Sequence, residues 1–150
     1  KLVCYEGKSE SYAKGFILSR YRYKKEKVLA HSFAKAYEKQ INLGFDPRYS
    51  LYHSESVVYD LKEESVAHEY ARVASSVAES DFGRLLARQC VYSKRDKDLA
   101  FSFTTEYLSK AKEVENKRLH YFYTKYKVYN GLNEKEARKK AFDKCGDSSS

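Results

Sequence analysis

The stretch QINLGFDPRY, residues 40–49, holds the single proline of the chain and one of its six glycines. Gly44 can adopt a left-handed conformation at little cost, so it suits the position just after the end of a helix. Phe45 follows where an apolar side chain can fold back onto the last helical turn. Asp46 can cap the next helix, and Pro47 suits its first position, where a missing N–H costs nothing. The sequence therefore predicts an αα-hairpin with its corner at Gly44, Phe45, Asp46 and Pro47.

Helical spacing of apolar residues extends in both directions from this corner. Before it, we expect a long helix that begins near Tyr12, after an N-terminal arm formed by residues 1–11. After it, we expect a second long helix from Pro47 to about Glu79. The apolar faces recur at intervals of three and four residues: Ala30, Ala34, Tyr37 and Ile41 in the first helix, and Val66, Tyr70, Val73 and Val77 in the second.

The rest of the chain also has helical patterns, separated by polar breaks at residues 80–83 and 93–98. Gly131 ends one helix, and Asn133 with Glu136 can form a capping box that starts the last one, which we expect to reach about Lys144 before a frayed tail, 146–150. The similar stretches AYEKQINLGFD and KYKVYNGLNEKEA are attributed to shared capping chemistry rather than to a repeat. Strand signals are weak, so we predict one all-α domain, residues 1–150, folded as an up-and-down bundle of five to six helices with two long leading helices.

The net charge of +8 is unevenly distributed along the chain. Residues 12–48 and 110–140 each carry +6, whereas residues 49–109 carry −3. This segregation favours an anionic partner over a uniformly solvated surface. No stretch of about 18 apolar residues could span a bilayer. Since the chain starts at Lys1 and contains no Met, we expect a processed product from which a targeting segment has been removed.

The sequence holds no phosphate-binding loop, metalloprotease motif, EF-hand loop or nucleophile elbow, so we expect no enzymatic activity, no cofactor and no metal site. The four histidines, among them His53 and His68, are at least fifteen positions apart and are interpreted as surface or packing residues. Glu63 and Glu64 point about 100° apart on a helix and form no acid/base pair. The three cysteines, Cys4, Cys90 and Cys145, lack zinc-site spacing; one disulfide, for example Cys4–Cys145, and three free thiols are equally compatible with the sequence.

Basic and aromatic residues are combined in two segments, SRYRYKKEK (19–27) and KRLHYFYTKYKVY (117–129). This combination is typical of surfaces that bind membranes or single-stranded nucleic acid. Some of the aromatic side chains in 117–129 must lie near the surface, because a helix buries only one stripe; the alternative is that these tyrosines line a wet boundary between helices. The predicted binding cations are Arg20, Arg22, Lys24, Lys25, Lys27, Lys117, Arg118, Lys125, Lys127, Arg138, Lys139 and Lys140. The predicted binding aromatics are Tyr21, Tyr23, Tyr121, Phe122, Tyr123 and Tyr129.

Residues 32–53, SFAKAYEKQINLGFDPRYSLYH, resemble the first helical corner of the abalone sperm lysin family. Phe33, Gln40, Ile41 and the corner residues Gly44 to Asp46 carry this resemblance, which elsewhere is limited to a basic, Tyr-rich chain of similar length. The absence of Trp and Met, the proline after Gly-Phe-Asp and the acidic middle depart from the lysin pattern. They favour the fusagenic branch of the family, whose members coat the acrosomal process.

The resemblance implies a non-enzymatic protein, secreted from the sperm acrosomal vesicle, that binds and destabilises membranes to promote sperm–egg fusion. An alternative within the family is dissolution of the egg vitelline envelope by binding its glycoprotein. A second alternative, from an unrelated class, is a basic helical nucleic-acid-binding protein. The expected partner is thus an anionic membrane surface or an egg-coat glycoprotein, with no small-molecule substrate, and a homodimer is left open.

Overall fold

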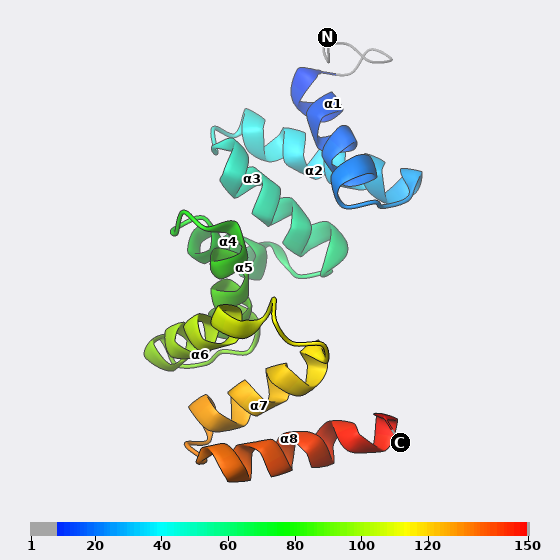
Figure 1. Cartoon of the computed structure of the whole chain (residues 1–150). Helices are drawn as coiled ribbons and strands as arrows, with labels where there is room; N and C mark the ends of the chain where they lie inside the picture. The colour runs from blue at the N-terminus through cyan, green and yellow to red at the C-terminus, as the bar shows by residue number, and fades with distance from the viewer. Residues whose placement is uncertain (1–8, 150) are drawn as a thin grey trace. The chain divides into compact units, whose positions relative to one another are not determined.

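The computed structural model describes residues 9–149, with side chains described as far as Cys145, and this part of the chain is all-α (Figure 1). Its eight α-helices run up and down, which confirms the predicted fold class with more helices than the five to six expected. The chain divides into two compact units, Lys1–Tyr92 and Ser93–Ser150, and each is described by itself. The single domain stays a prediction.

The first unit contains five α-helices, and three of them continue into a short π-helical segment (η). In chain order these are α1 Glu10–Ile17 with η2 Leu18–Arg22, α2 Lys27–Asn42, α3 Pro47–Ser54 with η3 Glu55–Tyr59, α4 Glu64–Ala74, and α5 Ser80–Ala87 with η4 Arg88–Tyr92. Neighbours in the sequence pack together: α1 on α2, α3 on both α2 and α4, and α5 on α4 (Figure 1).

The second unit consists of α6 Lys97–Lys110, α7 Lys117–Tyr129 and α8 Glu134–Ser149. In this unit α7 packs against both α6 and α8. Helix α8 reaches Ser149 and so extends through most of the segment expected to be a frayed tail. Most of the predicted N-terminal arm and Cys4, the proposed partner of Cys145, lie outside the described residues.

The corner at residues 44–47 has the capping interactions that the sequence predicts. Gly44 has φ 101°, and its N–H bonds to the carbonyl of Ile41 at 3.0 Å. Asp46 Oδ1 accepts from Tyr49 N at 2.8 Å, and Pro47 opens α3. Phe45 differs from the prediction: its ring stacks on Tyr49 at 4.6 Å between centroids, so it packs on the helix that follows the corner.

Each of the two long leading helices predicted from the sequence is divided in two by a residue with a left-handed backbone. Lys24 and Leu61 both have φ 56°, and after each of them a new helix begins three positions later. A left-handed conformation reverses the chain direction in a short space, and bulky residues seldom adopt it. The apolar spacing on both sides of these residues resembles one continuous helix, which is why the sequence did not reveal the breaks.

These left-handed residues belong to a tandem repeat of helix pairs. Lys24, Leu61, Lys94 and Gly131 recur at spacings of 37, 33 and 37 positions, each three positions before the first residue of a helix. The same spacings relate the N-caps of α1, α3, α5 and α7, which are Ser9, Asp46, Glu79 and Asn116. They also relate four fully buried alanines, Ala30, Ala67, Ala100 and Ala137. We refer to residues 9–45, 46–78, 79–115 and 116–149 as repeats 1 to 4; spacings of this size are typical of repeated supersecondary units.

The core of the first unit combines small residues with tyrosines. Tyr52 and Tyr70 pack against Ala71, Ala74 and Ala87, because alanine lets neighbouring backbones approach closely. A buried polar network lies beside them: Glu55 forms an ion pair with Arg84 and accepts hydrogen bonds from Tyr23 and Tyr70. Burial and the nearby carboxylate of Glu55 raise the pKa of Tyr23 and of Tyr70, so both phenols stay protonated donors. Among the described residues, no helix is long and apolar enough to cross a membrane.

Candidate functional site

A groove of about 600 Å³ lies in the second unit, between the end of α6, α7 and α8. Its lining combines apolar side chains with three cations, Lys110, Arg138 and Lys139. The other lining residues are Val114, Asn116, Leu119, His120, Tyr123, Ala141 and Phe142. Most of these residues come from α7, which bears the second basic–aromatic segment of the sequence, and from α8. This groove is our candidate functional site.

Capping and packing interactions fix the wall that α7 contributes to the groove. Asn116 Oδ1 accepts from Leu119 N at 3.0 Å and so determines where α7 begins. His120 is buried; its Nε2 lies 2.9 Å from the carbonyl oxygen of Tyr107, and its ring stacks on Tyr107 at 4.7 Å. Burial raises the pKa of Tyr107, with a further contribution from Tyr121. These contacts hold Asn116, Leu119 and His120 in place at the start of α7.

Helix α8 supplies the opposite wall and most of the charge. Ala137, Ala141 and Cys145 recur at four-residue spacing and are buried, so this stripe packs inward. Phe142 follows Ala141 and is therefore turned about 100° away from the buried stripe; it is 61 % exposed. A large apolar side chain at the edge of a basic groove is an exposed contact for the apolar part of a partner.

The cations at the groove differ in how far the protein neutralises them. Arg138 lies over the ring of Tyr123, with Cζ 5.0 Å from its centroid, and has a distant i,i+4 partner in Glu134 at 3.9 Å. Lys110 and Lys139 are exposed and form no ion pair within the described part of the chain. The positive potential of the groove is consequently available to an anionic partner.

Lys127 illustrates the opposite case among the predicted binding cations. Its Nζ lies 2.6 Å from Glu106 Oε2, and this hydrogen bond is the main reason that the pKa of Lys127 is raised. Lys117 also has a local role, since its Nζ donates to the carbonyls of Ala111 and Val114 just after α6. These two cations help to hold α6 and α7 together, whereas Arg138 and Lys139 line the groove; the binding role predicted for all four stays a prediction.

The aromatic side chains of α7 that were predicted to bind a partner are half-buried. This agrees with the alternative hypothesis that they line a boundary between helices. Tyr121 packs edge-on against Phe103 at 5.4 Å, and Tyr129 stacks on Phe103 at 5.3 Å. Phe122 is covered by three cations, Arg118, Lys125 and Lys144. Tyr123 alone among them lines the groove. Phe142, which the sequence analysis did not select, is the most exposed ring of the unit among those described; its position beside the Ala137–Ala141 stripe was the signal that could have identified it.

The first basic–aromatic segment, residues 19–27, belongs to the first unit and is partly structural. Arg20 donates to the carbonyl of Lys25 at 3.2 Å, and Lys25 lies over the ring of Tyr59 at 4.8 Å. Tyr23 contributes to the buried network of Glu55. Tyr21 is 70 % exposed, and three cations of the segment are exposed with it: Arg22, Lys24 and Lys27. The two basic–aromatic segments therefore lie in different units.

The fold and the groove thus define an all-α protein of tandem helix pairs with a basic, partly apolar groove. No protein-family model, curated protein or solved structure matches this chain.

Proposed function

We propose that this chain is a binding protein whose second unit docks onto anionic membrane surfaces through the groove between α7 and α8. The observation that carries the proposal is that the exposed Phe142 lies beside Arg138 and Lys139 on α8, at the edge of the groove. Cations near an anionic leaflet each contribute about 1 kcal/mol. An exposed aromatic ring adds to this by shallow insertion at the level of the headgroups.

The biological role proposed for this binding is the one that the sequence resemblance implies. A secreted acrosomal protein that inserts apolar side chains into a leaflet would perturb lipid packing and promote fusion of sperm and egg membranes, without covalent chemistry. Binding to an anionic egg-coat glycoprotein would use the cations but not Phe142. The dependence on Phe142 therefore separates the membrane proposal from the glycoprotein alternative, and from the binding of nucleic acid by charge alone.

The test is co-sedimentation of the full chain with phosphatidylcholine vesicles that contain or lack phosphatidylserine, at physiological salt. We expect binding to the anionic vesicles only. Lys139→Glu should weaken this binding by roughly tenfold or more, because it reverses one charge at the groove. Lys135→Glu is the matched control: it makes the same change on an exposed residue of α8 that does not line the groove, and it should have a much smaller effect.

Phe142→Ala tests the apolar contribution. Removing a ring that inserts into the leaflet should weaken vesicle binding by about tenfold, the equivalent of roughly 1.4 kcal/mol. Lipid mixing between labelled vesicles, measured in parallel, tests the fusion role. Equal effects of Lys135→Glu and Lys139→Glu, together with unchanged binding by Phe142→Ala, would show that only the net charge acts and would overturn the proposal.

A further inference from the structure

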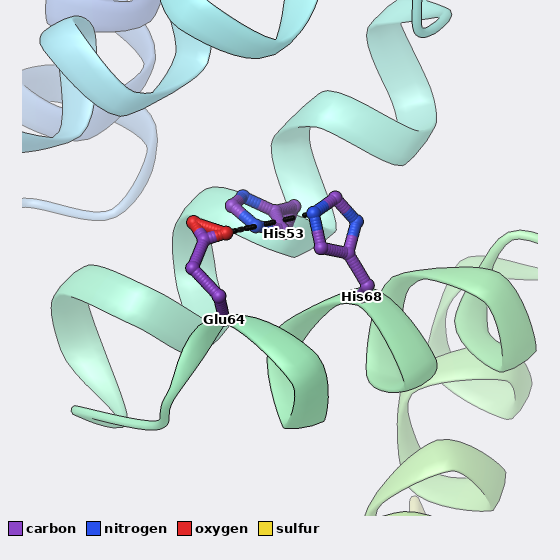
Figure 2. A group of neighbouring side chains, drawn as sticks. All are labelled: His53, Glu64 and His68. Carbon is purple, nitrogen blue, oxygen red and sulfur yellow. Dashed lines mark hydrogen bonds and ion pairs between the residues drawn. The ribbon is translucent and has the colours of Figure 1, made fainter.

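Three side chains of metal-binding type meet where α4 packs on α3 in the first unit. His53 comes from the last turn of α3, Glu64 is the first residue of α4, and His68 lies one turn further along α4 (Figure 2). Glu64 Oε1 lies 3.1 Å from His53 Nε2 and 3.5 Å from His68 Nε2. The three side chains point toward one another in Figure 2, and their ligand atoms all lie within 4.8 Å of one another.

The surroundings hold this cluster in place and leave one side of it accessible. His53 is 1 % exposed, whereas the side chain of Glu64 is 58 % exposed, so an ion could enter from the side of the carboxylate. Tyr49 Oη lies 2.6 Å from His68 Nδ1 and leaves Nε2 directed at Glu64. A partner on the second ring nitrogen is what orients most histidine ligands in metal sites.

The other repeats show that the fold does not require these three residues. The equivalent positions are Phe16, Lys27 and His31 in repeat 1, Leu86, Lys97 and Phe101 in repeat 3, and Tyr123, Glu134 and Arg138 in repeat 4. The positions of His53 and His68 are also in contact in two other repeats: the rings of Phe16 and His31 meet in repeat 1, and Arg138 lies over the ring of Tyr123 in repeat 4. Two histidines and a carboxylate therefore coincide in repeat 2 alone.

The buried histidine is also costly for a purely structural role. Its Nδ1 has no hydrogen-bond partner, although the residue is almost fully buried. A buried nitrogen without a partner destabilises the fold relative to an apolar side chain such as the phenylalanine or leucine of repeats 1 and 3. An imidazole at this position therefore needs a compensating gain elsewhere, and its Nε2, 3.1 Å from Glu64 Oε1, is the atom that can provide one.

We propose that His53 Nε2, His68 Nε2 and the carboxylate of Glu64 bind a divalent transition-metal ion, with zinc as the best match. Imidazole and carboxylate suit zinc, and three protein ligands leave a fourth position for water. Ligand atoms about 2.0–2.1 Å from a tetrahedral ion lie about 3.3 Å from one another. The distances from Glu64 Oε1 to the two Nε2 atoms, 3.1 and 3.5 Å, lie on either side of this value. The ligand atoms lie up to 4.8 Å apart, so the partly exposed His68 ring would have to rotate to bring its nitrogen closer to that of His53 when an ion binds. This site is independent of the groove, because all its residues lie in the first unit.

Calorimetric titration of the full chain with zinc chloride tests the proposal. We expect one zinc ion per chain, with an increase in melting temperature that a chelator reverses. The variants use residues that other repeats carry at the same positions: His53→Phe, Glu64→Lys and His68→Phe. Each should weaken zinc binding by at least about tenfold, while circular dichroism reports that the helices remain intact.

His31→Phe is the matched control. It removes the histidine of repeat 1, which also contacts a tyrosine, through Tyr12 Oη at 2.7 Å, and it should leave zinc affinity unchanged. Cobalt binding adds a spectroscopic test, since a site of nitrogen and oxygen ligands lacks the thiolate charge-transfer band that cysteine ligation would produce. The proposal would be overturned if the native chain failed to bind zinc, if cobalt binding produced a thiolate band, or if His53→Phe and Glu64→Lys bound zinc as tightly as the native chain does.

Discussion

Leu61 has a φ of 56° and a side chain that is 83 % exposed, so no packing interaction explains why a leucine occupies this position. Left-handed backbone costs an L-residue with a Cβ about 1–2 kcal/mol. Repeat 4 has Gly131 at the equivalent position, and a Cβ there would contact nothing within 4 Å. The helical break at Gly131 was predicted from the sequence because glycine indicates it. The break at Lys94 was predicted from the polar residues 93–98 around it, whereas the breaks at Lys24 and Leu61 carry no such signal and were missed.

Leu61→Gly should therefore stabilise the protein. Relief of the left-handed strain, less the entropy that glycine adds to the unfolded chain, gives an expected gain of about 0.5–1 kcal/mol in the free energy of unfolding. Urea denaturation followed by circular dichroism measures it. Leu43→Gly is the control, since Leu43 is also exposed but has φ −78°; it should lower stability. A loss of stability in both variants would contradict the assignment of strain to Leu61.

At the scale of elements, one unrecognised break decided what the sequence could reveal about the site in the first unit. If residues 47–79 formed one helix, His53 and His68 would be about 22 Å apart along its axis. The turn at Asp60–Glu63 instead folds α4 back onto α3, and the two imidazoles lie 4.4 Å apart between centroids. The helical class, the corner at Gly44 and several caps were predictable because each depends on residues close in sequence. The histidine cluster was not, because it depends on a chain reversal without a glycine.

Gly83 gives a prediction for the packing of α5 on α4. A Cβ at this position would lie 2.2 Å from the carbonyl oxygen of Ala74, a backbone atom that cannot move without displacing α4. Gly83→Ala should therefore lower the free energy of unfolding by about 2 kcal/mol or more, despite the better helix propensity of alanine. The measurement is again urea denaturation.

Gly15→Ala is the comparison for that variant. Its Cβ would meet Ala34 Cα at 3.0 Å and the side chain of Tyr37 at 3.1 Å, contacts that a small shift relieves. We expect a loss well below that of Gly83→Ala, because alanine regains up to about 1 kcal/mol of helix propensity. If both variants lost the same stability, the close approach at Gly83 would not be what limits the spacing of α4 and α5.

At the scale of the whole molecule, the two proposed sites occupy different units. The residues of the zinc site lie between 53 and 68, and those of the groove between 110 and 142, on either side of the division at Tyr92. The basic segments of the sequence are divided in the same way: residues 12–48 lie in the first unit and residues 110–140 in the second. One chain can therefore bind a metal ion and an anionic surface without either site using a residue of the other.

Separation of the sites predicts that their variants act independently. His53→Phe should abolish zinc binding and leave binding to anionic vesicles unchanged, whereas Lys139→Glu should do the reverse. In the double variant, each binding free energy should match that of the corresponding single variant within about 0.5 kcal/mol, as expected for sites that share no partners. Calorimetric titration with zinc and vesicle co-sedimentation, each carried out on all four proteins, measure the coupling. A vesicle affinity that depends on zinc in the native chain but not in His53→Phe would contradict independence and would instead make zinc a regulator of membrane binding.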